Sequence, residues 1–379
     1  MIRRIQSTLV AATLALASQA FAAAPGITPT EILIGQDLDQ SGAIAGRMKT
    51  LAQAADAYIE RVNKSGGVHG RKIRVIRTDS SNKPDKTKEN VKKLVETDGV
   101  FSMWGISGTG NVAVALPYLV ERNVPLIGST SGADPFYEKK HAMLFNLKAG
   151  YGDEIRRIAA HIKTTFAGKV AIVYLDNGFG REVLKTAQAA TAEQGLEVVA
   201  ITKFKEDGSD IPAAVKEAAS KNAPAVLLMT LAGPAPKVVE EYLKASPVRP
   251  QFYALSIVAS DSLYKALGEN SRGIIVTQIV PFPWDRSIPL VREYQEAVGA
   301  KGVTDFSPTG MEGYILAKAL VEGLRAAGKN PTRESLVSAF EGMRDKDLGG
   351  LSLGFSPSSH NGSRLVEITM IGRGGKLVR

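Results

Sequence analysis

The stretch VFSMWGISGTGNVAVALPYLVERNVPLI, residues 100–127, contains the pattern from which the fold class can be predicted. It opens with an apolar run at Val100–Trp104, passes through a glycine-rich loop into a helical pattern after Asn111, and closes with a second apolar run at Pro125–Ile127. Short apolar runs of this kind are typical of buried strands, and a helix between two of them lets the second strand lie parallel to the first. The stretch therefore predicts one strand–helix–strand unit of a parallel sheet.

The loop of this unit, WGISGTGNV at residues 104–112, has the glycine spacing of a phosphate-binding loop. Gly105 and Gly110 reproduce G-x-x-x-x-G, but a Walker A loop continues with a lysine for the outer phosphates and a hydroxyl for magnesium. Asn111 and Val112 stand at those two positions. The loop therefore has the shape of a nucleotide site without its chemistry.

The same alternation extends outward in both directions. Before the unit we expect strands at Glu31–Gly35 and Lys72–Arg77 and helices at Ala45–Asn63 and Pro84–Glu96. After it, a helix at Gly152–Lys163 opens a second series of strands, which we expect at Val170–Leu175, Glu197–Ile201, Ala225–Met229, Gln251–Leu255 and Gly273–Thr277. Long helices at Met311–Ala327 and Arg333–Phe340 follow. Repeated units of this kind predict parallel sheets with helices on both faces.

The fold class is therefore α/β, with two doubly wound parallel-sheet lobes. We expect residues 26–148 in lobe 1, 149–277 in lobe 2, 278–356 as a return to lobe 1, and 357–379 packing on lobe 2. The proline-rich segment QIVPFPWDRSIP, residues 278–289, is interpreted as an extended crossing between the lobes. Ligands of open parallel sheets bind outside the carboxyl ends of the strands, so two facing sheets predict one shared cleft.

The first 22 residues have the parts of a secretory signal. Arg3 and Arg4 precede an apolar run at Leu9–Ala17, and Ala20-Phe21-Ala22 is an A-x-A cleavage site. The run is shorter than the roughly 20 residues that a membrane span needs. The chain has no cysteine, which excludes disulfides, thiolate metal sites and a lipid-bearing cysteine. We therefore expect export to the periplasm without a lipid anchor.

The charge pattern and the histidines argue against nucleic acid and against catalysis. The formal charge of +9 falls to +7 without Arg3 and Arg4, and the basic residues are interspersed with acidic ones. The four histidines, His69, His141, His161 and His360, have no metal-ligand spacing. We expect no enzyme activity, no cofactor, no metal and no nucleic-acid partner.

Three segments carry a resemblance to a known family. They are SGAIAG from Ser41, AADAYIERVNKSGGVHGRKIRVIRTDSSNKPDKT from Ala54, and STSGADP from Ser129. They resemble the periplasmic leucine/isoleucine/valine-binding protein family, the solute receptors of branched-chain amino acid ABC importers. The resemblance implies two lobes joined by three crossings, a small-molecule ligand in the cleft between them, and an ABC transporter membrane permease as partner. We expect a monomer.

In lobe 1, the resemblance places Thr109, with Ser107 and Asn111 beside it, at the ligand carboxylate. The loop after the fourth strand contributes Thr130, Ser131, Gly132 and Ala133. Glycines that let the backbone approach and a helix N-terminus with unpaired N–H groups suit an anion independently of the family. The alternative is that these residues only form the turn and cap the helix.

In lobe 2, the sequence departs from the family pattern. The family uses an acidic residue for the ligand ammonium, and here that place falls at or near Ser256, where we expect no carboxylate. Asp261 lies five residues further on. Arg47 stands where the family often has an aromatic residue, and it would match a carboxylate, or else lie exposed at the helix start. Phe179 and Leu231 are expected as apolar walls, and Tyr151 and Met311 are weaker candidates for the same role.

These residues predict a ligand with a carboxylate and an apolar body. An aromatic or aliphatic carboxylic acid fits, as does a neutral amide. A branched-chain amino acid fits if Asp261 or a backbone carbonyl reaches the ammonium, because a buried ammonium without an anion is costly. The mechanism is a hinge in which the ligand shifts the lobes from open to closed. The alternative function is a sensor that presents the same closed form to a chemoreceptor or kinase.

Overall fold

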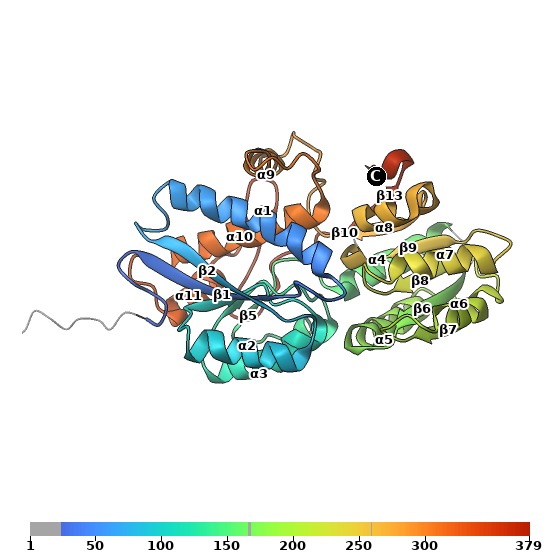
Figure 1. Cartoon of the computed structure of the whole chain (residues 1–379), viewed down its shortest axis with the longest axis horizontal. Coiled ribbons are helices and arrows are strands. Elements are labelled where there is room, and N and C mark those ends of the chain that lie inside the picture. Colours follow the sequence, from blue (N-terminus) through green and yellow to red (C-terminus); the bar gives the residue numbers. More distant parts are fainter. Residues whose placement is uncertain (1–23, 166–167, 259) are drawn as a thin grey trace, which may run out of the picture.

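Two α/β lobes lie side by side along the long axis of the molecule (Figure 1). The computed structural model describes residues 24–165, 168–258 and 260–379, without the side chains of 260–262. The predicted signal segment, residues 1–22, lies outside the described residues.

The first sheet is parallel and belongs to the left-hand lobe of Figure 1. Its strands lie in the order β2-β1-β3-β4-β5, with bounds β1 Glu31–Leu38, β2 Lys72–Asp79, β3 Ser102–Trp104, β4 Leu126–Ile127 and β5 Leu144–Phe145. Its helices are α1 Ala45–Lys64, α2 Pro84–Glu96, α3 Thr109–Glu121, α9 Pro289–Gly299, α10 Pro308–Ala326 and α11 Arg333–Glu341. The quoted stretch thus forms β3, α3 and β4, as its pattern predicts.

The helices α1 and α10 pack together so closely that a side chain is excluded at one position. A Cβ added at Gly313 of α10 would lie 2.0 Å from the carbonyl oxygen of Leu51 in α1. Because the helix returning from the second lobe is pressed against α1 in this way, it is buried on nearly every side. The late segment is therefore an integral part of the first lobe's core.

The second sheet is mixed, in the order β14-β13-β10-β9-β8-β6-β7. Its bounds are β6 Lys169–Leu175, β7 Glu197–Phe204, β8 Ala225–Met229, β9 Gln251–Ala254, β10 Ile275–Gln278, β13 Glu367–Ile371 and β14 Leu377–Val378. Its helices are α4 Tyr151–Thr165, α5 Gly178–Glu193, α6 Ile211–Ala219, α7 Ala235–Ala245 and α8 Ser260–Leu267. The strands from β6 to β10 are parallel, as predicted, and β13 and β14 extend the sheet beyond β10 in antiparallel fashion. The chain re-enters this lobe at its end, beside β10 and without a crossover helix.

Three segments connect the lobes: 146–150 after β5, 279–288 after β10, and 354–366 before β13. The first and third lie against each other, since Asn146 and Asn361 form an isolated bridge and Asn146 Nδ2 donates to Asn361 Oδ1 at 2.9 Å. A small hairpin of β11 Lys346–Asp347 and β12 Ser352–Leu353 precedes the third crossing. The crossings leave the carboxyl ends of both sets of parallel strands on the side where the lobes face each other (Figure 1).

Candidate ligand site between the lobes

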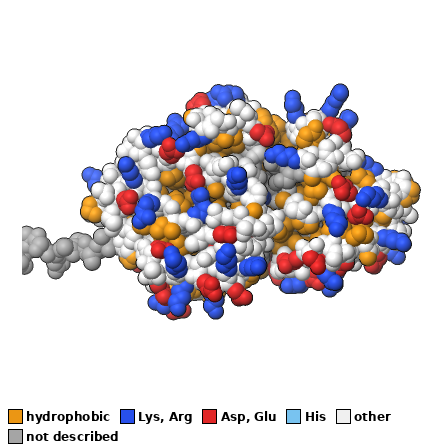
Figure 2. Space-filling model, viewed as in Figure 1, with side chains coloured by type: hydrophobic (Ala, Val, Ile, Leu, Met, Phe, Trp, Pro, Cys, Tyr) orange, Lys and Arg blue, Asp and Glu red, His pale blue; other side chains and the backbone are white. Residues whose placement is uncertain are grey.

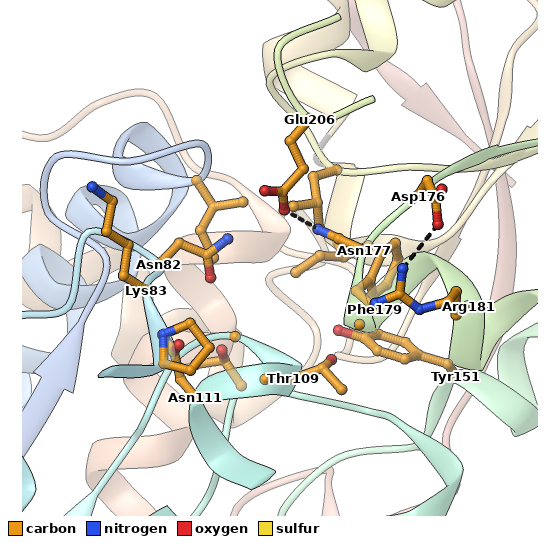
Figure 3. Close-up of a pocket in the computed structure, with 18 residues that line it drawn as sticks. Asn82, Lys83, Thr109, Asn111, Tyr151, Asp176, Asn177, Phe179, Arg181 and Glu206 are labelled. Carbon is orange, nitrogen blue, oxygen red and sulfur yellow. Dashed lines mark hydrogen bonds and ion pairs between the residues drawn. The ribbon is translucent and has the colours of Figure 1, made fainter. Parts of the chain in front are cut away.

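A cavity of about 370 Å³ lies between the lobes, where loops after the strands of both sheets meet. Its size is at the lower end of the range for small-molecule sites. The first lobe contributes Ile44, Asn82, Lys83, Pro84, Gly108, Thr109, Gly110, Asn111 and Thr130, and the remainder of the lining is Tyr151, Asp176, Asn177, Gly178, Phe179, Arg181, Glu206, Leu231 and Ile257 (Figure 3). The cavity therefore has walls from both lobes, as the strand-end rule predicts.

The first-lobe wall presents hydrogen-bond donors without an acceptor. Helix α3 begins at Thr109 with no side-chain cap and no acidic residue in its first turn, so its leading N–H groups face the cavity uncompensated. The hydroxyls of Thr109 and Ser131 lie 2.9 Å apart and hydrogen-bond each other. The buried hydroxyl of Thr130 has no partner among the described residues. A carboxylate is the group that would satisfy these donors together.

Gly108 is the residue that lets this wall form. Its φ of +89° is strained for other residues, and an added Cβ would lie 2.4 Å from Asn82 Oδ1. Asn82 itself adopts a positive φ of 55° in the loop after β2. The two loops therefore pack directly on each other at the start of α3.

The second-lobe wall is apolar. Phe179 and Tyr151 form an edge-to-face pair with ring centroids 5.3 Å apart, and Leu231 and Ile257 extend the surface. Phe179 is placed here because α5 begins directly against β6: a Cβ on Gly180 would lie 1.7 Å from the carbonyl oxygen of Leu175. An apolar body of the ligand would pack on these side chains.

The mouth of the cavity holds the charged residues. Figure 3 shows Asn82 and Lys83 of the first lobe on one side and Glu206, Asn177 and Asp176 of the second lobe on the other. The acidic groups already have partners: Lys203 and then Arg181 hold the pKa of Asp176 below its usual value. Glu206 accepts a hydrogen bond of 2.7 Å from Asn177.

Five of the residues predicted from sequence line the cavity: Thr109, Asn111, Thr130, Phe179 and Leu231. Tyr151, a weaker candidate, lines it as well, whereas Met311 does not appear in the lining.

Four other predicted residues lie one layer behind the first-lobe wall. Ser107 Oγ accepts from the backbone N–H of Asp39 at 2.7 Å, and Ser131 supports Thr109. Gly132 lies against the Tyr151 ring, where a Cβ would be 2.8 Å from Cδ1. Ala133 is buried and donates its N–H to Ser131 Oγ. These residues are outside the cavity lining and hold the loop that shapes it.

Arg47 is neither exposed nor in the lining. It is 4% exposed and forms an ion pair with Glu312 of α10, so the interpretation as a solvated residue at the helix start is wrong. Burial raises the pKa of Glu312, but the charges of Arg47 and Lys148 outweigh it and hold that pKa below its usual value. This ion pair could not be predicted from the sequence, because Arg47 and Glu312 are 265 residues apart.

Ser256 has a carboxylate against it, contrary to expectation. Glu154 of α4 accepts from the backbone N–H of Ser256 at 2.8 Å, from its hydroxyl at 3.0 Å and from the hydroxyl of Thr277. Burial raises the pKa of Glu154, and these donors offset part of the effect. Glu154 could not be identified from the sequence, because an acidic residue in a first helical turn is ordinary capping chemistry. The side chain of Asp261 lies outside the described residues.

Two α/β lobes, three crossings and a cavity shared by both lobes define a bilobed solute-binding protein. Residues 31–376 match the model of the periplasmic binding protein family, and the chain belongs to that family. The family is one of solute-binding proteins and not of enzymes. No helix in the described part of the chain is long and apolar enough to cross a membrane. On the face in Figure 2, acidic and basic side chains are interspersed.

Solved structures share this fold over more than nine-tenths of the chain. A substrate-binding periplasmic protein from Ralstonia solanacearum is 28% identical, with a TM-score of 0.85 over 92% of this chain and 99% of that chain. A branched-chain amino acid ABC transporter protein from Thermus thermophilus with bound valine is 18% identical, with a TM-score of 0.83 over 93% and 96%. By sequence, the Leu/Ile/Val-binding protein homolog 8 of Brucella suis is 24% identical over 99% of this chain and 96% of its own length.

Proposed function

We propose that this protein captures a small carboxylate-bearing molecule between its two lobes and delivers it to the membrane permease of an ABC importer. The observation that carries the proposal is the pairing of opposite walls. Unpartnered donors at Thr130 and the start of α3 face an apolar surface of Tyr151, Phe179, Leu231 and Ile257. A carboxylate on one side and an apolar body on the other fit this arrangement.

The ligand is an aromatic or aliphatic carboxylic acid or a branched-chain-type amino acid. A protein of the same fold from Thermus thermophilus contains valine, and another, from Thermomonospora curvata, is described as a fatty acid ABC transporter substrate-binding protein with 21% identity and a TM-score of 0.83 over 94% of this chain and 92% of that chain. Among the acidic residues lining the cavity, Asp176 and Glu206 lie at the mouth and have partners. This distribution favours a carboxylic acid without an ammonium group.

Delivery follows from closure of the lobes around the ligand. A ligand that touches both lobes binds the closed arrangement better and shifts the population toward it. The signal-like residues 1–22 support export to the periplasm, and the lack of cysteine in the sequence supports a protein without a lipid anchor. The closed monomer would then dock on the permease.

A thermal-shift screen of the mature chain tests the proposal. Branched-chain amino acids, aromatic carboxylates, aliphatic acids and short amides are each compared with buffer. A ligand specific for the folded state adds about 2.7 kcal/mol of stability at a hundredfold excess over its Kd. We expect a shift with carboxylic acids, and a shift that needs the carboxylate. A shift with amides alone, or with none of the four classes, would contradict the proposal.

A further inference from the structure

A buried ionic trio lies behind the cavity, formed by Arg47 of α1, Lys148 of the first crossing and Glu312 of α10. The Arg47 guanidinium contacts one Glu312 oxygen, and Lys148 Nζ lies 3.2 Å from the other. The three side chains are at most 5% exposed. Two cations therefore share one carboxylate in a place that water does not screen.

The trio is incompletely neutralised. Arg47 Nε and Nη1 are buried and have no hydrogen-bond partner among the described residues. The other carboxylate nearby, Glu154, is already engaged by donors from Ser256 and Thr277. Burial raises the pKa of Glu154, and the charge of Lys148 is among the causes that oppose the rise. The trio by itself holds two cations and one anion.

Tyr151 connects the trio to the cavity. Its ring lies over Lys148, with Nζ 5.8 Å from the ring centroid. Burial raises the pKa of its phenol; the charge of Arg47 opposes the rise, and the charges of Glu154 and Glu312 add to it. Figure 3 shows this hydroxyl directed toward the middle of the cavity, on the side of Thr109. The hydroxyl is therefore a donor that faces the ligand with a cation behind it.

We propose that the Arg47–Lys148–Glu312 trio determines ligand charge: it makes the cavity bind a carboxylate in preference to an uncharged molecule of the same shape, with the Tyr151 hydroxyl as the contacting donor. The inference rests on the proposed function and deepens it. Arg47 acts through Tyr151 and the field of the trio, without contacting the ligand. This explains why an arginine can be buried beside a glutamate and still serve the site.

The test uses two variants that break the same ion pair and change the buried charge in opposite directions. Arg47→Gln removes the excess positive charge, whereas Glu312→Gln increases it. The double variant Arg47→Gln/Glu312→Gln lacks the pair but keeps the trio's net charge, and it serves if Glu312→Gln alone does not fold. Calorimetry measures Kd for two matched pairs, 4-methylpentanoate with 4-methylpentanamide and 3-phenylpropanoate with 3-phenylpropanamide.

We expect the wild-type protein to prefer the acid over the amide. Arg47→Gln should reduce this preference about tenfold, and Glu312→Gln and the double variant should retain it. An equal change of the preference in Arg47→Gln and in the double variant would mean a structural role and would overturn the inference alone. A wild-type protein that binds leucine but prefers neither acid over its amide would also overturn the inference alone. One that binds no carboxylate, leucine included, would overturn the proposed function and the inference with it.

Discussion

Thr130 shows how a single side chain can serve binding at no benefit to the fold. Its hydroxyl is buried beside the cavity without a partner among the described residues. In the ligand-free protein, the free-energy cost of desolvating this hydroxyl is therefore not offset by a hydrogen bond. Thr130→Val keeps the shape and removes the hydroxyl. We expect unchanged or slightly higher thermal stability without ligand, and a Kd for the carboxylate raised about 10- to 150-fold, since a hydrogen bond to a charged group contributes about 1.5–3 kcal/mol.

The matched control is Thr87→Val. The Thr87 hydroxyl is buried in the same lobe but donates to Asp37 at 2.7 Å, away from the cavity. This variant should lose stability while its affinity for ligand stays unchanged. The reverse pattern in the two variants would refute the role given to Thr130.

Glu312 makes stability depend on pH in a definite direction. Its pKa is held below the usual value in the folded protein despite burial, because Arg47 and Lys148 favour the charged form. A lowered pKa in the folded state gives stability that is present above the unfolded-state pKa, about 4.3, and that is lost as the pH falls through the folded value. Urea unfolding from neutral to acid pH should therefore show a gap between wild type and Glu312→Gln that narrows below about pH 4.

Glu60 provides the control for this experiment. Its pKa is lowered to about 2 by hydrogen bonds from Lys301 and Lys64, but the group is exposed to solvent. Salt screens exposed pairs and leaves buried pairs largely unaffected. The gap for Glu312→Gln should persist in about 0.5 M salt, and any gap for Glu60→Gln should disappear. Equal salt sensitivity would contradict the buried character of the trio.

Residues close to a strand end were predictable, and long-range partners were not. Thr109, Thr130, Phe179 and Leu231 line the cavity because each follows a strand that the apolar pattern locates. Arg47 with Glu312, and Ser256 with Glu154, are separated by 265 and 102 residues. Only the packed fold brings such pairs together, so their roles could not be read from local pattern.

At the scale of elements, the start of α3 depends on Gly108. Gly108→Ala would place a methyl group 2.4 Å from Asn82 Oδ1 and force a side chain into φ +89°. We expect a loss of about 1–3 kcal/mol in the free energy of unfolding and weaker ligand binding, because the leading N–H groups of α3 shift. Chemical denaturation and calorimetry on the variant measure both effects.

Gly46→Ala is the control for Gly108→Ala. Gly46 lies in the first turn of α1, and an added Cβ would meet nothing within 4 Å. This change should stabilise the protein by up to about 1 kcal/mol, since alanine favours helix. If both substitutions cost the same stability, the special geometry of Gly108 would be refuted.

Helices and strands were predicted correctly where they are long enough to show a hydrophobic period. The structure has the helix Pro84–Glu96 and the strand Ala225–Met229 at the expected bounds. The helix that begins at Ala45 ends at Lys64, one residue later than expected. The two-residue strands β5, β11 and β12 are too short to show a period. The antiparallel pairing of β13 was unpredictable for another reason: alternation along a strand does not give the direction of its neighbour.

At the scale of the whole molecule, the two lobes also touch each other beyond the crossings. A Cβ on Gly233, in the loop after β8, would lie 2.9 Å from the carbonyl oxygen of Ala43 in the first lobe. Asp134 of the first lobe accepts a hydrogen bond of 2.6 Å from Thr186 of α5. The structure therefore represents an arrangement in which the lobes have approached each other.

Gly233→Val should prevent this approach without harming either lobe. Because the obstructing atom belongs to the backbone, the loops must separate to make room for the valine. We expect ligand affinity to fall at least tenfold, a larger radius of gyration with ligand by X-ray scattering, and an unchanged unfolding midpoint without ligand. Wild-type affinity in this variant would show that the contact between Ala43 and Gly233 is not needed for binding.

Capture of the ligand between closing lobes is tested most directly by the distance between the lobes with and without ligand. The chain has no cysteine, so Lys88→Cys on α2 and Lys205→Cys after β7, both exposed, can be spin-labelled selectively. Pulsed electron paramagnetic resonance then gives the distribution of distances between the two spin labels in buffer, with 4-methylpentanoate, and with leucine. We expect a bound carboxylate to shift the distribution to one shorter, narrower distance, and Thr130→Val to require more ligand for the same shift. A carboxylate that binds by calorimetry and leaves the distribution unchanged would contradict capture between closing lobes.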